Sequence, residues 1–541
     1  MKAWGTIRHE QQYKCTDKVF IRVWCLAVYK HFLGMKEKNM NFMDNLEKEQ
    51  NNAKTLTENY AVAYETSGDA LLDFNFRITD LRSSSYSEVV STFKKLFYTD
   101  KILAIRYLFY VGDIREGLGE RHIFKSCIRW LAKAEPDMTK KILSLIPEYS
   151  RWDILVSLIT VKEVKSVVRR IVHNQLVEDE FNCKEGRPIS LLAKWMPSEN
   201  TSSKDTRNLA RVMMKELEMK PKKYRKTLSK LRAYLDVVEV KMSSHGWDKI
   251  NYETVPSKAN LNYSNAFMRN DAERRTEYLE ALKSGKAKIN AKVLQPHEII
   301  NSYCYKYNGW GGMYLEYNET LEQLWQNLED VTISDTLVVR DGSGSMWVPV
   351  AGRTRAVDVA TALAIYCSEH TTGEFKNRFV TFSSRPKVVG LSNCKTLKDK
   401  IMRCYAEDDI SNTDIYKTMQ LILDTAVKNN MTQEDMPKTI LIISDMQFDG
   451  RYCNYNKTLF EHIREKYEDN GFKLPRICFW NLCGYNASTV PLQDNELGLI
   501  LCSGFSVNNL KMFMSGEIDP LKILLEVVNS ERYDKVLKAL T

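Results

Sequence analysis

The amino-acid sequence predicts an α-helical repeat domain followed by a doubly wound α/β domain. From residue 46 to residue 330, apolar side chains recur mostly at intervals of three or four, the spacing of one face of a helix. From residue 331 to residue 541, short β-branched runs alternate with helical stretches, which is typical of a parallel sheet covered by helices. We therefore expect an N-terminal extension over 1–45, a helical domain over 46–330 and an α/β domain over 331–541.

In the first part, a long helix is expected at 91–111, where Phe93, Leu96 and Phe97 begin an apolar run at helical spacing. Further helices are expected at 122–133, 138–145, 151–160, 161–175, 206–219, 224–235 and 271–283. Pairs of helices joined by short turns indicate an array like an α-solenoid of the HEAT type. The sequence of this part shows no repeat of fixed length.

In the second part, strands and helices are expected to alternate. Strands are predicted at 336–340, 378–384, 387–391, 438–445, 476–482 and 497–503. Helices are predicted at 356–370, 414–429 and 458–470, and again from Asn508 and Pro520. The run at 438–445 is almost wholly apolar, as expected of a strand covered on both faces. The ligand site of such a domain should lie beyond the carboxyl ends of the strands, where the strand order reverses.

Composition excludes several classes of protein. Apolar residues make up 44% of the chain and charged residues 27%, which excludes a collagen and a mostly disordered chain. No uncharged apolar run reaches the roughly 18 residues of a membrane helix, so no membrane partner is expected. The 12 cysteines are scattered and form no CxxC pair, which argues against a zinc site and a disulfide framework. Reduced thiols and the lack of a signal peptide indicate a cytoplasmic protein.

The excess positive charge lies in the first part of the chain. The residues up to 330 include 53 basic and 43 acidic side chains, whereas those from 331 onward include 25 and 26. This distribution indicates an anionic partner for the helical domain, and nucleic acid is the simplest one.

Acidic and hydroxyl side chains follow two predicted strands of the α/β domain. Asp341, Ser343 and Ser345 come after the first strand, Thr413 opens a helix, and Asp445 ends the most apolar strand. At the switch point of a doubly wound sheet these groups would meet as a set of hard oxygen donors, which suits Mg²⁺ or another divalent cation. Taken alone, an Asp-Gly-Ser-Gly-Ser string is usually a polar turn, and the agreement of the three separate segments favours the metal site.

This arrangement resembles the metal-ion-dependent adhesion site of von Willebrand factor A domains. The resemblance implies that Ser343, Ser345 and Thr413 bind the metal directly, and that Asp341 and Asp445 act directly or through water. Asp414, directly after the threonine, is an additional acid that could alter metal affinity. An acidic group from a protein partner could complete the coordination shell.

Residues 113–121 (DIREGLGER) resemble the signature of the TROVE module found in Ro ribonucleoproteins. Segments at 57–76, 151–153, 192–198, 247–259 and 295–300 resemble an uncharacterised TROVE-related family of bacteria, phages, large viruses and plants. The resemblance implies a helical array closed into a ring by the A-type domain, with small structured RNA or RNA ends on a basic face. The alternative for 113–121 is an architectural turn in which Arg115 and Arg121 pair with Asp113 or Glu120.

The densest basic stretch runs from residue 204 to residue 232. Helical spacing gives it a basic face that could neutralise phosphates, and Tyr224 and Tyr234 could stack on unpaired bases. The alternative is a solvated helix face. The candidate RNA-binding residues are Lys204, Arg207, Arg211, Lys222, Lys223, Arg225, Lys226, Lys230 and Arg232.

We therefore expect a protein that binds RNA, which the resemblance implies to be a small non-coding RNA, and that carries a magnesium-dependent ligand site. No nucleophile or general base is identified, so no catalytic residue is assigned and an enzyme is not expected. One alternative is a protein-interaction scaffold whose metal site captures a partner carboxylate. Another is a metal-dependent nuclease acting on the bound RNA.

Overall fold

The computed structural model describes residues 54–56, 62–64, 66–303, 305–307, 313–408, 414–446, 459–483, 499–510 and 519–541. The chain divides into two compact units, Met1–Lys54 and Thr55–Thr541, and the account below concerns the second. The expected N-terminal extension over residues 1–45 lies outside the described residues.

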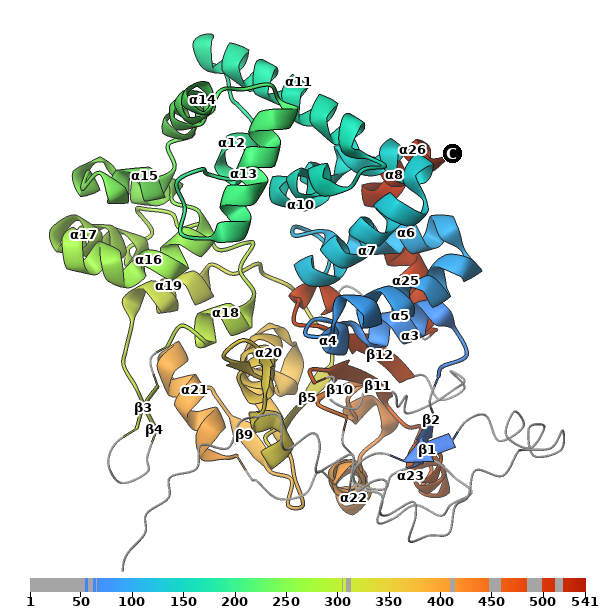
Figure 1. Ribbon diagram of the computed structural model, residues 1–541. Helices are drawn as coiled ribbons and strands as arrows, with labels where there is room; N and C mark the ends of the chain where they lie inside the picture. Colours follow the sequence, from blue (N-terminus) through green and yellow to red (C-terminus); the bar gives the residue numbers. More distant parts are fainter. Residues whose placement is uncertain are drawn as a thin grey trace, which may run out of the picture. The chain divides into compact units, whose positions relative to one another are not determined.

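An array of helices fills the first part of this unit, drawn in blue to yellow in Figure 1. After the short strands β1 (Lys54–Leu56) and β2 (Val62–Tyr64), the helices follow one another with short connections. They are α3 (Ala70–Phe76), α4 (Ile78–Leu81), α5 (Tyr86–Thr99), α6 (Lys101–Gly112), α7 (Arg121–Ala134), α8 (Pro136–Ile142), α9 (Ile146–Tyr149), α10 (Trp152–Ser157), α11 (Lys165–Lys184), α12 (Leu192–Trp195), α13 (Lys204–Glu216), α14 (Pro221–Tyr234), α15 (Val238–Ser243), α16 (Ser257–Asn270), α17 (Ala272–Lys283), α18 (Pro296–Ile300) and α19 (Glu319–Gln326). A small hairpin of β3 (Tyr305–Tyr307) and β4 (Met313–Leu315) precedes α19.

The single helix expected at 91–111 is wrong, because the structure has two helices there. Asp100 separates α5 from α6 with extended backbone angles, and its Oδ1 accepts a hydrogen bond from the Leu103 amide at 2.9 Å. An aspartate that caps a new helix in this way satisfies an amide left without a partner in the first turn. The helical spacing of apolar residues continues across Asp100, which explains why the sequence predicts one continuous helix over 91–111.

The second part is built on a six-stranded sheet in the order β12-β11-β10-β5-β8-β9. Neighbouring strands are parallel except for β9, which pairs antiparallel with β8. The strand order reverses between β5 and β10, which lie side by side with Arg340 opposite Ile443. The helical part and the mixed α/β sheet confirm the predicted fold class. The specific A-type topology stays a prediction.

Helices cover both faces of this sheet. Its strands are β5 (Thr336–Asp341), β8 (Arg378–Phe382), β9 (Val388–Gly390), β10 (Thr439–Ser444), β11 (Arg476–Asn481) and β12 (Leu499–Ser503), with a small hairpin of β6 (Pro349–Ala351) and β7 (Thr354–Arg355) after β5. Its helices are α20 (Ala356–His370), α21 (Leu397–Ala406), α22 (Ile415–Lys428), α23 (Leu459–Asp469), α25 (Pro520–Val528) and α26 (Asp534–Leu540). Apolar residues of α22 and α23 form one core with the sheet, while α20 and α21 belong to the larger core shared with the helical array.

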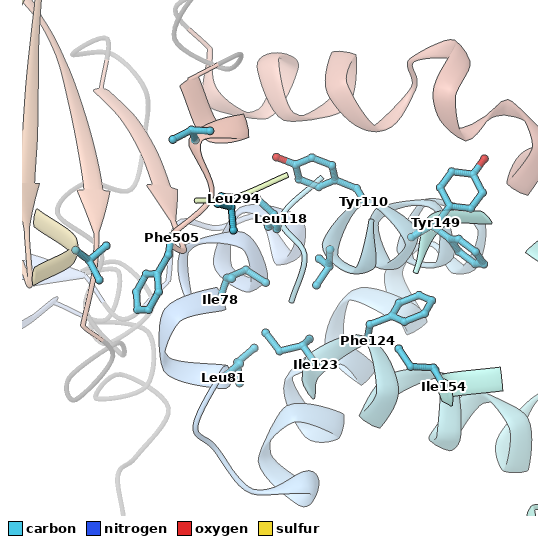
Figure 2. Close-up of a cluster of buried hydrophobic side chains, with 14 of the residues drawn as sticks. Ile78, Leu81, Tyr110, Leu118, Ile123, Phe124, Tyr149, Ile154, Leu294 and Phe505 are labelled. Atoms are coloured by element: carbon cyan, nitrogen blue, oxygen red, sulfur yellow. The ribbon is translucent and has the colours of Figure 1, made fainter. Parts of the chain in front are cut away.

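Both ends of the helical array contact the α/β part. The first helices pack against β12, α25 and α26, and the last helices, α18 and α19, pack against α20 and α21. Figure 2 shows the first of these junctions, where Phe505, after β12, lies in one buried cluster with Ile78 and Leu81 of α4. Among the described residues, no helix is long and apolar enough to cross a membrane, and no cysteine forms a disulfide.

Candidate metal site and basic surface

Asp341 lies at the carboxyl end of β5, next to the end of β10, where the strand order reverses. Its carboxyl group is fully buried. Oδ1 accepts a hydrogen bond from the Ser343 amide at 2.9 Å, and Oδ2 accepts one from the Ser444 hydroxyl at 2.6 Å. The Ser343 and Ser345 hydroxyl oxygens are 3.0 Å apart. The structure therefore brings three of the predicted metal ligands, Asp341, Ser343 and Ser345, into one turn.

Asp445 follows β10 directly and is also buried. Burial, and then the charge of Asp445, raise the pKa of Asp341 to about 7, although hydrogen bonds from Ser444 and Ser343 act in the opposite direction. Two carboxylates that disfavour each other's charge are a suitable environment for a cation. Thr413, the fifth predicted ligand, lies outside the described residues.

The donor chemistry of this turn fits a hard divalent cation. The groups that converge are carboxylates and hydroxyls, which bind Mg²⁺ in preference to softer metals. Within the described part of the chain, no three His, Cys, Asp or Glu side chains are grouped so that they could hold a metal ion, so a metal here would depend on the serine hydroxyls. Asp414 has a different local role, because its Oδ1 caps α22 by accepting the Lys417 amide at 3.0 Å.

Sequence reasoning missed a buried ion pair beside this turn. Arg340, the penultimate residue of β5, is 1% exposed and donates from Nη1 to Asp408 Oδ1 at 2.6 Å. Its Nε and Nη2 donate to the Thr361 hydroxyl at 3.1 and 2.8 Å. A side-chain Cβ on Gly342 would lie 2.4 Å from Asp408 Oδ1, so only glycine fits there. The available signal was an arginine inside an otherwise apolar strand, which requires a buried anionic partner.

The nine predicted RNA-binding residues lie on α13 and α14, and four of them are engaged within the protein. Arg207 donates to the carbonyl oxygens of Thr201 and Ser202, and Arg211 donates to Asn208. Arg225 pairs with Glu199 at 2.7 Å. Arg232 donates to the carbonyl oxygens of Ala193 and Met196 and to the Ser198 hydroxyl. These contacts orient the four guanidinium groups and hold α13 and α14 in place.

The remaining five are exposed lysines whose ammonium groups make no hydrogen bond or ion pair with any described residue. They are Lys204, Lys222, Lys223, Lys226 and Lys230. Four of the five lie on α14, whose opposite face is buried through Tyr224, Leu228 and Leu231.

The expectation that Tyr224 stacks on bases is wrong. Its side chain is 1% exposed, and its hydroxyl donates to the Pro197 carbonyl oxygen at 2.7 Å. Tyr224 belongs to the apolar face of α14, which packs on α11 and α12. Tyr234 is 38% exposed, and its hydroxyl donates to the Arg187 carbonyl oxygen.

The segment at 113–121 joins the helical array to the α/β part. Asp113 is fully buried and accepts hydrogen bonds from Arg532 Nε at 2.8 Å and from Arg532 Nη2 at 3.2 Å. The Gly117 carbonyl oxygen accepts hydrogen bonds from Ser506 and Asn508. Glu120 binds Arg82, whose guanidinium lies over the Phe505 ring.

The architectural interpretation of this segment therefore fits the structure, but its expected ion pairs are wrong. Arg115 donates to the Glu148 carbonyl oxygen, and Arg121 pairs with Asp153 at 2.5 Å. The true partners of Asp113 and Glu120 lie elsewhere in the sequence, where local spacing gives no sign of them.

Comparison with known proteins places these features in a family. A family model described as a domain of unknown function (DUF2828) matches residues 57–140 and 162–331, and another (DUF7788) matches residues 335–538. The crystal structure of the Deinococcus radiodurans RO (RSR) protein is similar with a TM-score of 0.43 and 14% sequence identity, over 84% of this chain and 99% of that one.

Among curated proteins, the chain is similar to an uncharacterized protein, L728, of Acanthamoeba polyphaga mimivirus. The two are 30% identical over 515 residues, which cover 88% of this chain and 87% of the viral protein. The chain therefore belongs to the family of this viral protein, with a DUF2828 region followed by a DUF7788 region.

Proposed function

We propose that the protein binds RNA through the exposed lysines of α14. The observation that carries this proposal is a set of four exposed lysines on one helix whose ammonium groups make no hydrogen bond or ion pair with a described residue: Lys222, Lys223, Lys226 and Lys230. Lys222, Lys226 and Lys230 follow one another at intervals of four, so they line one side of the helix over about 12 Å. Like charges gathered in this way are stabilised by a polyanion.

Nucleic acid is the polyanion that best fits the rest of the helical part. Its charge excess extends beyond α14, and phosphate contacts from lysine need no particular base sequence. The resemblance of residues 113–121 to the signature of Ro ribonucleoproteins agrees with this partner and favours a small structured RNA or an RNA end. No reaction is proposed, because no general base or nucleophile has been identified at the candidate metal site.

The test is ultraviolet crosslinking and sequencing of nucleic acid that co-purifies with the protein. A variant with Lys222, Lys223, Lys226 and Lys230 changed to Glu should lose a defined RNA that the parent carries. A matched variant changes four exposed lysines of the α/β part, Lys376, Lys395, Lys428 and Lys473, to Glu and should keep it. No RNA on the parent, or equal loss from both variants, would contradict the proposal.

A second candidate function is capture of an acidic protein group at the Asp341 turn. It rests on the convergence of Asp341, Asp445, Ser343 and Ser345 at the switch point of the sheet. A bound divalent cation would supply a Lewis acid there that accepts a carboxylate oxygen. The serine hydroxyls and the buried carboxylates would hold and orient it.

This candidate is tested with immobilised protein and a fluorescent poly-glutamate peptide. Retention should require Mg²⁺, disappear in EDTA, and be lost in the Ser343→Ala/Ser345→Ala variant. Because RNA binding through α14 should weaken steeply with salt and be indifferent to EDTA, the two functions give opposite responses.

A further inference from the structure

A cavity of about 1010 Å³ lies in the helical part, outside both the Asp341 turn and the exposed lysines of α14. Its walls come from α7, α10, α12, α13, α14 and α15. Three sequence motifs that are far apart along the chain meet in it. Arg121 ends the 113–121 segment, Arg151 and Asp153 come from 151–153, and Trp195 comes from 192–198. This convergence suggests that the motifs share a site as well as a structural role.

The charged groups of this cavity are held in place before any ligand arrives. The Arg151 guanidinium lies 3.7 Å from the centre of the Trp195 ring. Its Nε and Nη2 donate to the two oxygens of Asp153 at 3.0 and 2.8 Å, and Arg121 Nη2 donates to the same carboxylate at 2.5 Å. One carboxylate therefore fixes two guanidinium groups, and the cluster keeps a positive charge.

Two lysines add cations, and the ammonium group of Lys194 lies 5.9 Å from the centre of the Trp195 ring. Lys125 is exposed, Lys194 is half-buried, and neither ammonium group makes a hydrogen bond or ion pair with a described residue. In all, five basic and three acidic side chains line the cavity, so it favours an anion. Hydroxyl and amide groups, such as those of Ser198 and Asn200, supply further polar contacts to its wall.

We infer that this cavity binds a nucleotide unit of single-stranded RNA. Lys125 and Lys194 contact the phosphate, and the base stacks on the face of the Arg151 guanidinium that Trp195 leaves open. Unpaired bases commonly stack on aromatic rings and on guanidinium planes, and such contacts tolerate any base. Double-stranded RNA keeps its bases paired and stacked, so it offers none to the cavity. The inference rests on the proposed RNA binding but assigns a second, separate site.

The first test measures binding of a fluorescent 12-nucleotide single-stranded RNA by anisotropy. The Lys125→Glu/Lys194→Glu variant should bind at least ten-fold more weakly than the parent. Neither ammonium group makes a hydrogen bond or ion pair with a described residue, so the one described contact that this change removes is that of Lys194 with the Trp195 ring. The Lys376→Glu/Lys395→Glu variant has the same charge change in the α/β part and should bind as the parent does.

The outcomes separate this inference from the proposed function. Loss in the α14 variant with none in the Lys125/Lys194 variant would overturn the cavity site and leave RNA binding intact. Failure of the parent to bind any RNA would overturn both. Loss in the Lys125/Lys194 variant, with a weaker effect on a fully duplexed RNA of equal length, supports the cavity site.

A second variant tests the stack without changing charge. Arg151→Lys keeps the cation but removes the planar group, so binding should weaken several-fold while the salt dependence stays the same.

RNA carrying 4-thiouridine should crosslink to the peptide that contains Trp195, and crosslinks confined to α14 would overturn the inference. Displacement of the RNA by millimolar AMP would assign the site to free nucleotides as well, and lack of displacement would assign it to the RNA strand.

Discussion

The Asp341 carboxyl is buried beside a second carboxylate, and this makes its charge depend on pH near neutrality. Its pKa of about 7 is above the ordinary value of 3.8, so between these values the folded protein holds a proton that the unfolded chain has released. The contribution to stability is therefore present at low pH and is lost as the pH rises through about 7. A divalent cation held by these residues would compensate for this loss, since its positive charge would offset that of the deprotonated carboxylates.

This residue-scale argument predicts how Mg²⁺ acts on thermal stability. Without metal, the melting temperature should fall between pH 6 and pH 8, and 5 mM Mg²⁺ should raise it more at pH 8 than at pH 6. Differential scanning fluorimetry measures both effects. Ser343→Ala/Ser345→Ala should remove the response to Mg²⁺ and keep the fall with pH, whereas Asp341→Asn should reduce both. A response to Mg²⁺ that is equal at the two pH values would contradict the assignment.

The buried pair of Arg340 and Asp408 leads to a second prediction at this scale. Asp408→Ala leaves the Arg340 charge buried without its partner and should lower the free energy of unfolding by about 3–5 kcal/mol. The double variant Arg340→Met/Asp408→Leu removes both charges and should recover most of that loss. Urea denaturation of the parent and the two variants measures this, and a double variant no more stable than the Asp408→Ala protein would contradict the prediction.

At the scale of single elements, the break between α5 and α6 depends on one side chain. Asp100→Ala removes the oxygen that accepts the Leu103 amide and should destabilise the protein by about 1 kcal/mol. Asp100→Asn keeps an acceptor in the same position and should cost less. Urea unfolding curves of both variants test the cap. Equal free energies of unfolding for the two variants would mean that the break is maintained by packing of α5 against α6.

Elements with a strong apolar pattern are predictable from the sequence. The strand expected at 438–445 is β10, wholly buried; Ser444 at its end donates a hydrogen bond to Asp341, and Asp445 follows directly. The partner of Arg340 is not predictable, because Asp408 is 68 residues away and no local pattern joins them. The error at Tyr224 could have been avoided, since Tyr224, Leu228 and Leu231 follow helical spacing on one face. The lysines of α14 are visible in the sequence only as charge, which indicates that they are exposed but identifies no partner.

At the scale of the whole molecule, the carboxyl-terminal segment of the α/β part binds to the helical array. Arg532 and Tyr533 both donate to the buried Asp113 carboxylate, and α26 packs on α6 and α8. Two charge-assisted hydrogen bonds from one guanidinium hold this junction, and each is worth about 1.5–3 kcal/mol when the acceptor is buried.

Arg532→Ala should therefore release the end of the chain. Hydrogen exchange of α26 amides should become at least ten-fold faster, while exchange in β5 and β10 stays unchanged. Lys538→Ala, an exposed site on the same helix, serves as the control and should leave exchange as in the parent. Unchanged protection of α26 in the Arg532→Ala protein would show that apolar packing alone maintains the junction.

The attachment of the helical array at both ends has a consequence for how this architecture can evolve. An open solenoid can gain or lose repeats at a free end, because each repeat depends only on its neighbours. Here the first helices are held by β12, α25 and α26, and the last by α20 and α21, so neither end is free. An added helical pair would have to break one of these junctions. The α/β part thus fixes the distance that the helical array must span. Insertions and deletions in the array are therefore confined to the loops between its helices.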